Sequence, residues 1–198
     1  DSQGFLMNRQ RATNSLNLED NHRVLVEVPD DTGFSFAEDA TTGSNDDSAF
    51  SVSAWIYMNN ATYFPIVNKY KTSNVEWRFS VASTDKLYFN VLDRLMHKIK
   101  RTDNSSGGTE GRLYNTALTS MENEWVHVAA TYTGDQSDAA GGIILYINGD
   151  SVHSGSVDNN GGSYTGMEQK TSNLLVGQET LNELYADGKI DDLLIYSK

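Results

Sequence analysis

The sequence predicts an all-β protein, built as an antiparallel sandwich of two sheets or a jelly roll. Short stretches in which apolar and polar residues alternate recur along the 198 residues, and no long helical pattern occurs. Gly is abundant at 16 residues and Pro is scarce at 2, while β-branched and aromatic residues come in bursts. No change in composition splits the chain, so we expect an N-terminal arm over residues 1–14 and one domain over residues 15–198.

The domain is predicted to begin with two short strands at residues 15–18 and 24–28. In the second, valines alternate with other residues until Pro29 stops the run. Residues 30–48 are rich in Asp, Thr, Gly, Ser and Asn, a composition typical of a long surface loop. The next strand alternates without a break from residue 50 to residue 58. Its predicted core-facing residues are Phe50, Val52, Ala54, Ile56 and Met58.

Three further strands are predicted in the first half of the domain. Residues 63–69, 76–81 and 86–92 are rich in aromatic and β-branched residues, which suit a pleated surface. Residues 97–101 form a short basic stretch, which we interpret as an edge strand on which Lys discourages aggregation. Residues 102–111 carry turn-forming residues and are predicted to be a loop.

The second half of the domain is predicted to open with a hairpin. Its first arm, residues 125–133, alternates apolar with polar residues, and its second arm is the apolar run at residues 143–147. Asn148-Gly149 follows, the dipeptide that best accepts the positive φ angles of a two-residue turn. A return strand is therefore expected from Val152. The closing elements are predicted as a strand at residues 173–176, a helical turn at 181–185 and a strand at 189–196.

The composition excludes several classes of site. Without Cys the chain holds no disulfide, zinc thiolate site or Fe–S cluster. We expect no membrane insertion, because no run of ~18 apolar residues is present. The formal net charge of −12 repels phosphate backbones, which argues against nucleic acid as a partner. Many of the acidic residues lie in predicted loops that also contain Asn. Carboxylate and amide oxygens are the ligands that calcium prefers, so these loops could bind calcium. The alternative is that the acidic residues serve only to keep the protein soluble.

Four segments together resemble one known family. Residues 125–134 read W-V-H-V-A-A-T-Y-T-G, and residues 142–149 read G-I-I-L-Y-I-N-G. The strand at residues 50–56 reads F-S-V-S-A-W-I, and the closing strand at residues 188–196 reads G-K-I-D-D-L-L-I-Y. In this order and spacing, and together with the opening strands, they are similar to LamG-like jelly-roll domains of the concanavalin A-like lectin/glucanase superfamily. The resemblance implies that fold for almost the whole chain, a fold that hosts many functions.

The resemblance also implies a structural calcium ion at the closing strand. Similar jelly-roll proteins hold this ion by an Asp of that strand and by groups from the first strands. Asp192 matches the strand residue and Asp20 the acidic residue of the opening turn, while Asp46 and Asp47 are further candidates. A carboxylate at position 192, with apolar residues two positions away on either side, is costly unless paired or bound to a metal. The alternative is that it accepts hydrogen bonds from turn amides and binds nothing.

A second candidate site consists of polar and aromatic residues that alternate against the predicted core positions. Aromatic rings stack on sugar rings, and Arg and Asn supply directional hydrogen bonds to hydroxyls, so we predict that these residues form one glycan-binding face. The alternative is a partly covered outer sheet face or an interface with a partner chain. The predicted face comprises Trp55, Tyr57, Arg78, Tyr88, Asn90 and His127.

Two function classes remain open. The first is a non-catalytic extracellular carbohydrate-binding or adhesion module with a structural calcium ion, whose partner is a glycan. The second is a structural or decorating domain of a larger assembly, such as a virion surface protein or a bacterial adhesin, whose partners are neighbouring subunits. The N-terminal arm, the absence of Cys and the acidic loops favour the second class. Glucanases of this fold carry an E-x-D-x-x-E run that provides their catalytic carboxylates, and this sequence lacks it. A glycoside hydrolase or lyase is therefore the third and least favoured function class.

Overall fold

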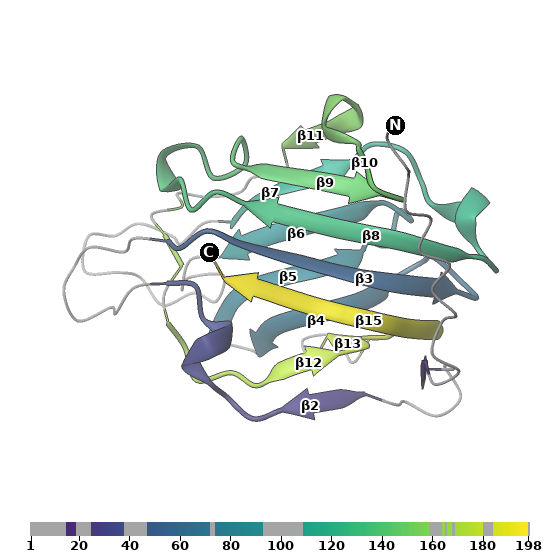
Figure 1. The fold of residues 1–198 in the computed structure, drawn as a ribbon, viewed down its shortest axis with the longest axis horizontal. Coiled ribbons are helices and arrows are strands. Elements are labelled where there is room, and N and C mark those ends of the chain that lie inside the picture. Colours follow the sequence, from purple (N-terminus) through teal and green to yellow (C-terminus); the bar gives the residue numbers. More distant parts are fainter. Residues whose placement is uncertain are drawn as a thin grey trace, which may run out of the picture.

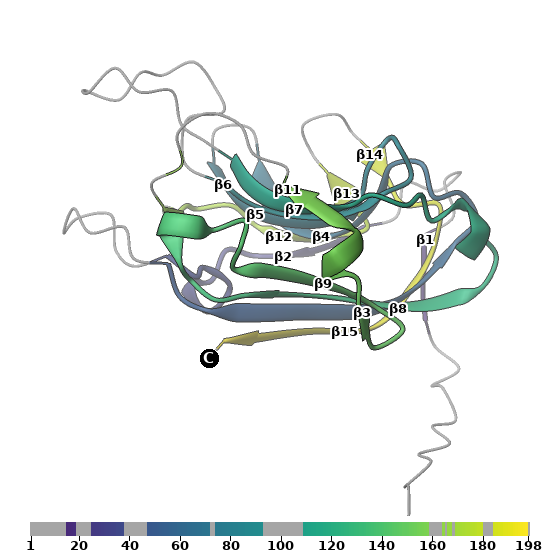
Figure 2. The same cartoon turned by 90° about the horizontal axis from the view of Figure 1, so that it is seen from above.

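The computed structural model describes residues 15–18, 25–37, 47–71, 74–92, 109–158, 164, 166–167, 169–179 and 184–197. Two antiparallel sheets pack face to face, which confirms the predicted sandwich (Figure 1). Figure 2 shows one nearly flat sheet, and above it a curved sheet whose concave side is turned away from the flat one. The predicted strand at residues 97–101 and the predicted arm at residues 1–14 lie outside the described residues.

The described residues of the flat sheet form six strands, and those of the curved sheet form seven. In spatial order the flat sheet contains β1 (Leu16–Leu18), β15 (Gly188–Ser197), β3 (Phe50–Met58), β8 (Trp125–Tyr132), β9 (Ile143–Ile147) and β10 (Asp150–Ser151). The curved sheet contains β11 (Ser156–Asp158), β7 (Thr109–Tyr114), β6 (Leu87–Leu92), β5 (Asn74–Val81), β4 (Phe64–Lys71), β12 (Leu174–Val176) and β2 (Val26–Val28).

A separate hairpin of β13 (Gln178–Glu179) and β14 (Leu184–Tyr185) lies in the connection from the curved sheet to the flat one. The helices among the described residues are single 3-10 turns, and none is long or apolar enough to cross a membrane. They are η2 (Thr32–Phe34), η3 (Thr119–Met121), η4 (Gln136–Asp138) and η5 (His153–Gly155).

The core lies between the two sheets and follows the predicted alternation. All five predicted core-facing residues of β3 are buried, and in β8 the buried positions alternate from Val126 to Tyr132. The rings of Phe36 and Phe50 stack with centroids 3.9 Å apart, and Trp77 lies 5.5 Å from Phe50. This aromatic cluster joins the two sheets, because Phe50 belongs to the flat sheet and Trp77 to the curved one. Apolar burial of this kind stabilises the sandwich by ~25 cal/mol for each Å² removed from water.

Three predictions on local structure need correction. Residues 109–111, predicted as loop, belong to β7, where Gly111 pairs with Asn90. A Cβ at Gly111 would lie 1.9 Å from Asn90 Nδ2, so this glycine provides space inside a strand and does not mark a turn. Residues 184–185, predicted as a helical turn, form β14. The return strand begins at Asp150 and not at the predicted Val152. It directly follows a turn with positive φ angles at Asn148 (52°) and Gly149 (89°), and these angles are the ones that the Asn-Gly dipeptide predicted.

A β-bulge in β5 decides which side its charged residues face. Lys69 pairs with Trp77 and Tyr70 pairs with Val75, so Glu76 is an extra residue without a partner on β4. Trp77 packs in the core, and Lys69, directly opposite, points the same way. Glu76 joins them inside the sandwich, where its carboxylate meets the Lys69 ammonium at 3.1 Å.

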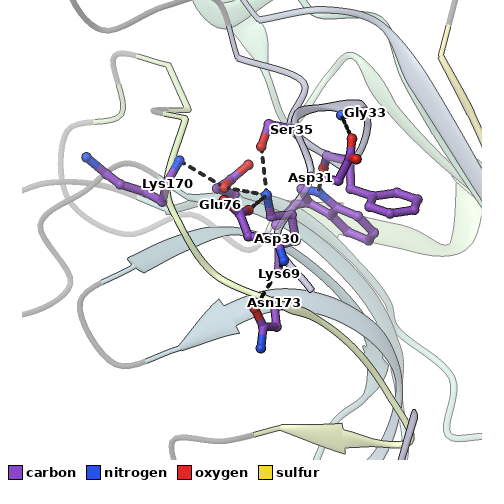
Figure 3. A network of polar contacts seen from close by, with 10 residues as sticks. Asp30, Asp31, Gly33, Ser35, Lys69, Glu76, Lys170 and Asn173 are labelled. Carbon is purple, nitrogen blue, oxygen red and sulfur yellow. Dashed lines mark hydrogen bonds and ion pairs between the residues drawn. The ribbon is translucent and has the colours of Figure 1, made fainter. Parts of the chain in front are cut away.

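The Lys69 ammonium is surrounded by oxygen atoms although its side chain is fully buried (Figure 3). Besides Glu76, it donates to Asp30 Oδ1 at 2.8 Å and to Ser35 Oγ at 2.7 Å. The Glu76 carboxylate also accepts the backbone N–H of Lys170 at 3.0 Å. Burial raises the pKa of Glu76 even though the Lys69 charge and these hydrogen bonds lower it. The network connects the segment before η2 and the segment before β12 to the inner side of the curved sheet.

Candidate functional site

The concave face of the curved sheet carries three of the predicted site residues. Arg78 on β5 pairs with Asn90 on β6, and Ser80 pairs with Tyr88. Because the inward positions of both strands are occupied by core residues, these four side chains lie on the outer side. The β13–β14 hairpin lies over the same face, since Glu179 reaches Arg78.

A pocket of about 220 Å³ lies between the hairpin and the sheet. This volume is below the roughly 300–1,000 Å³ of pockets that enclose drug-sized ligands, so the pocket suits a single small ring. It combines aromatic rings with a few polar groups, as binding sites for small polar ligands do. Its lining consists of Tyr63, Pro65, Arg78, Ser80, Val81, Ala82, Ser83, Tyr88, Glu179 and Leu184.

The Arg78 guanidinium is fixed from four directions. It lies 5.1 Å from the ring centroid of Tyr70 and 4.9 Å from that of Tyr88, within the range of cation–π attraction. Its Nε donates to Asn90 Oδ1 and its Nη1 to Glu179 Oε1, both at 3.3 Å. The Arg78 side chain is 19% exposed and that of Glu179 is 7% exposed. Arg78 is therefore a preorganised donor in the pocket and has little freedom to turn elsewhere.

The β13–β14 hairpin is attached to the sheet by polar contacts near its base. Asn68 Nδ2 on β4 donates to the backbone oxygen of Gln178 at 2.6 Å. Within the hairpin, Gln178 Nε2 donates to the Tyr185 hydroxyl at 3.0 Å and so ties β13 to β14. The backbone N–H of Gly177, just before β13, donates to Ile66 O at 3.1 Å. These contacts set the position of Glu179, the residue that the hairpin contributes to the pocket.

Tyr63 forms the rim of the pocket in an unusual backbone conformation. Its φ angle is 55°, in the left-handed region that bulky side chains rarely adopt, and the residue is 45% exposed. Its N–H donates to Ala82 O at 3.2 Å, and neighbouring Thr62 is held through its hydroxyl by Asp85 Oδ1 at 2.7 Å. Strain of this kind costs ~1–3 kcal/mol and concentrates at binding sites. The fold thus presents an aromatic ring at the pocket entrance at an energetic cost.

Burial shifts two ionisable groups in the pocket. It raises the pKa of Tyr88 to about 12, so this hydroxyl stays protonated and can donate. Burial also raises the pKa of Glu179, although the Arg78 charge and hydrogen bond act in the opposite direction. The described lining of the pocket therefore places one cation, one carboxyl group and the two phenols of Tyr63 and Tyr88 within a small volume.

The prediction of one six-residue face is wrong, because the residues lie on two different sheets. Arg78, Tyr88 and Asn90 lie on the concave face of the curved sheet. The other three lie on the outer face of the flat sheet, on the far side of the core. Alternation tells which residues point outward from a strand, but it does not tell which sheet the strand joins. These remaining residues are Trp55, Tyr57 and His127.

The three outward residues of the flat sheet form cross-strand pairs. Trp55 and His127 lie opposite each other with ring centroids 5.2 Å apart, and Tyr57 meets Trp125 at 5.7 Å. Lys189 Nζ lies 5.4 Å from the Tyr57 ring. Burial lowers the pKa of His127, which keeps the ring neutral near pH 7. Pairs of this kind stabilise the sheet. His127 also borders a depression of about 290 Å³ on this face, together with Tyr146 and Tyr196.

Tyr63 and Glu179 complete the pocket, and the sequence did not single them out. Tyr63 falls at the predicted start of a strand, where an aromatic residue is ordinary. Glu179 falls in the connection between the predicted strands at residues 173–176 and 189–196, and nothing in the sequence indicates that this connection folds back over a sheet. A long-range contact between Glu179 and Arg78, separated by 101 positions, leaves no local pattern.

The premise for a metal site at Asp192 does not hold. The register of β15 against β3 shifts between Asp191 and Leu194, and Asp192 takes a φ angle of 46° at this bulge. The shift exposes Leu194 and leaves Asp192 exposed as well, so its carboxylate is not buried between apolar neighbours. Asp20 and Asp46 lie outside the described residues. Within the described part of the chain, no group of three or more acidic or His side chains could hold a metal ion.

Asp47, the neighbouring candidate, is occupied by protein donors. Its Oδ2 accepts the hydroxyl of Tyr132 at 2.6 Å and also that of Tyr164. Its Oδ1 accepts the N–H of Met167 at 2.8 Å. Burial raises the pKa of Asp47 against the effect of these hydrogen bonds. The carboxylate thus joins Tyr164 and Met167 to Tyr132 at the end of β8.

Comparisons with known proteins agree with the described architecture. A family model described as the concanavalin A-like lectin/glucanases superfamily matches residues 30–198. A proposed carbohydrate-binding protein from Bacteroides ovatus ATCC 8483 is 15% identical, with a TM-score of 0.52 over 92% of this chain and 42% of its own. Domains LG4-5 of the mouse laminin alpha1 chain are 10% identical, with a TM-score of 0.50 over 95% of this chain and 45% of their own. The chain thus spans less than half the length of either structure. Among curated protein sequences, none matches significantly.

Proposed function

Because the chain belongs to the concanavalin A-like lectin/glucanases superfamily, we propose that it is a non-catalytic carbohydrate-binding module that acts outside a cell. The concave pocket is the proposed sugar site. The observation that carries this proposal is Tyr63, an exposed aromatic ring held at the pocket entrance by a strained backbone. Aromatic rings at such entrances stack on the apolar faces of sugar rings.

The polar groups of the pocket suit sugar hydroxyls. The Glu179 carboxylate accepts hydrogen bonds from hydroxyl donors, and Arg78 donates to hydroxyl or ring oxygens. Both groups lie at the wall formed by β5 and the β13–β14 hairpin. Tyr88 adds an aromatic surface beside them. A single sugar ring at the end of a longer glycan would occupy the pocket, with the next unit resting on Tyr63.

The acidic groups favour binding over cleavage. Glycosidases of most families use two carboxyl groups that flank the scissile bond, ~5–9.5 Å apart. Among the described residues that line the pocket, Glu179 is the only carboxylic acid. It is already paired with Arg78 at 3.3 Å. The described lining therefore offers a hydrogen-bonding partner for a sugar but no acid and nucleophile pair.

Calorimetric titration against a panel of oligosaccharides tests this function. Tyr63→Ala removes the stacking ring, and we expect it to weaken binding by about tenfold, the equivalent of ~1.4 kcal/mol. Trp55→Ala is the matched control, because it removes an aromatic ring from the outer face of the flat sheet, and we expect unchanged affinity. Equal losses in both variants, or a wild-type protein that binds no sugar, would contradict the proposal.

Calcium remains a prediction of the family resemblance. The described residues do not provide a set of ligands, since Asp192 is exposed at a bulge and Asp47 is bonded to protein donors. If Asp20 and Asp46 hold an ion with a third group, the ion stabilises the folded state by mass action. A melting curve with and without a chelator is the measurement, and an unchanged midpoint would rule out a structural calcium ion.

A second candidate function, a structural domain of a larger assembly such as a virion surface, is favoured by the outer side of β15. Leu194 is 44% exposed and Tyr196 is 56% exposed. A shallow depression of about 400 Å³ lies beside Tyr196 and includes Phe50 and Thr131. If this surface joins subunits, Leu194→Glu should shift the protein to a smaller species in analytical ultracentrifugation. A wild-type protein that is monomeric at all concentrations would argue against this candidate.

A further inference from the structure

The pocket contains a balanced pair of charges. Of the described residues that line it, Arg78 and Glu179 are the charged ones, and they form an ion pair with each other. Asn90 Oδ1 takes a further hydrogen bond from the Arg78 guanidinium. The cation that would attract an acidic sugar is therefore already compensated before any ligand arrives.

The surroundings keep this pair together. Arg78 is held between the rings of Tyr70 and Tyr88, at 5.1 and 4.9 Å from their centroids. Glu179 is held by β13, whose backbone is attached to Asn68 through the oxygen of Gln178. A ligand carboxylate that approached Arg78 would have to displace Glu179 or lie beside it. Two like charges in a partly desolvated pocket repel each other, and the net charge of −12 adds to this effect.

A hydroxyl group meets the opposite situation. The Glu179 carboxylate forms charge-assisted hydrogen bonds with hydroxyl donors, and these are stronger than bonds between neutral groups. Adjacent hydroxyls of a sugar ring can donate to Glu179 and accept from Arg78 without separating the two residues. The ion pair itself then becomes a recognition element for an uncharged ring.

We propose that the pocket selects uncharged sugars and that Glu179 is the residue that excludes acidic ones. This inference rests on the proposed carbohydrate-binding function and specifies its ligand class. Removing the negative charge at position 179 leaves the Arg78 guanidinium available to a ligand carboxylate. Glu179→Gln therefore converts the pocket from one that rejects acidic sugars to one that accepts them.

The experiment measures affinity for matched neutral and acidic oligosaccharides, such as the same core with and without a terminal sialic acid or uronic acid. We expect the wild-type protein to bind the neutral member of each pair at least tenfold more tightly. Glu179→Gln should reduce this ratio to about one or reverse it. Glu124→Gln is the matched control, because Glu124 is exposed before β8 and the change in net charge is the same. It should leave the ratio as in the wild type.

A second measurement does not depend on any variant folding correctly. Salt screens the long-range repulsion from the net charge of −12, but it screens the contact with Glu179 much less, because that side chain is only 7% exposed. The wild-type preference for neutral sugars should therefore persist at high ionic strength, while the affinity for the neutral members stays nearly constant. A preference that vanishes at high salt would show that the net charge, and not Glu179, excludes acidic sugars.

The outcomes separate the two levels of the proposal. A wild-type protein that prefers acidic sugars, or a Glu179→Gln variant that keeps the wild-type ratio, overturns the assigned role of Glu179 and leaves carbohydrate binding intact. A wild-type protein that binds neither member of any pair overturns the proposed function together with this inference.

Discussion

Strand β5 contributes one charged residue to each side of the curved sheet, and the two lie in very different surroundings. Glu76 lies inside the sandwich with Lys69, and both side chains are fully buried. Arg78 lies on the concave face with Glu179, where its side chain is partly exposed and lines a pocket. Regular alternation would place positions 76 and 78 on the same side, and the bulge separates them. A single extra residue thus lets one strand anchor the interior and shape the proposed binding site.

The two ion pairs differ in how far the surrounding protein shields them from water. The interior pair is enclosed by both sheets and by the segment that holds Asp30 and Ser35. The outer pair involves a short hairpin that contacts one face of one sheet. The Arg78 side chain is already 19% exposed to water, whereas both side chains of the interior pair are fully buried. Removing one partner should therefore cost more in the interior, and three of the following four predictions test this difference.

The largest effect is expected at Lys69. Lys69→Met leaves the carboxylates of Glu76 and Asp30 without their cation, and removing one partner of a buried pair costs ~3–5 kcal/mol. The double variant Lys69→Met/Glu76→Leu removes both buried charges and should recover most of this loss. Urea denaturation measures the free energy of unfolding of each variant. A single variant within about 1 kcal/mol of the wild type would show that water reaches the pair.

A smaller loss is expected at Arg78. Arg78→Met leaves Glu179 without its partner, but the hairpin can shift so that water solvates the carboxylate. We expect destabilisation of ~1–3 kcal/mol, the cost of leaving a polar group without a partner. The same denaturation experiment provides the comparison. If Arg78→Met costs as much as Lys69→Met, the hairpin is as rigid as the core and the proposed difference between the pairs is wrong.

The strain at Tyr63 is testable with two variants that both lack the ring. Tyr63→Gly accepts the left-handed φ angle freely, whereas Tyr63→Ala keeps the penalty of its Cβ. We expect the Gly variant to be more stable than the Ala variant by ~1 kcal/mol, and both to lose sugar affinity. Thermal unfolding gives the order of stability. An Ala variant at least as stable as the Gly variant would mean that position 63 is not strained.

The smallest effect is a change in the dependence of stability on pH. Burial raises the pKa of Glu76 and of Glu179, so the folded protein holds these protons more tightly than the unfolded chain does. Their contribution to stability is complete below the ordinary glutamate pKa, and it is lost as the pH rises through the raised values. Glu76→Gln should flatten this decline more than Glu179→Gln, because the interior is harder to hydrate. Denaturation midpoints between about pH 4 and about pH 8 provide the slopes.

The pattern of the sequence predicted the parts of the fold that depend on regular alternation. Strands β3 and β8 lie where residues 50–58 and 125–133 predicted them, and the turn after β9 has the predicted positive φ angles. These features are local, since two-residue periodicity and an Asn-Gly turn are set by neighbours in the chain. The family resemblance then predicted how the strands combine, and the match over residues 30–198 confirms it.

The site could be predicted only in part, because bulges and sheet membership break the local pattern. The bulge near Asp192 exposes a carboxylate that alternation placed in the interior. The bulge at Glu76 buries a carboxylate beside Lys69. Arg78 and Tyr88 were identified as outward residues, yet the residues predicted to join them from β3 and β8 lie on the other sheet. Tyr63 and Glu179 reach the pocket through contacts between positions far apart in the chain, and no spacing in the sequence predicts such contacts.

The place of the β13–β14 hairpin in the chain has an evolutionary consequence. It lies in the link between β12 of the curved sheet and β15 of the flat sheet, and its two strands pair with each other. Insertions or deletions in this link would reshape one wall of the pocket and leave the register of both sheets unchanged. Exchanging a few residues between positions 178 and 185 can therefore change the lining of the pocket while the core sequence is kept intact.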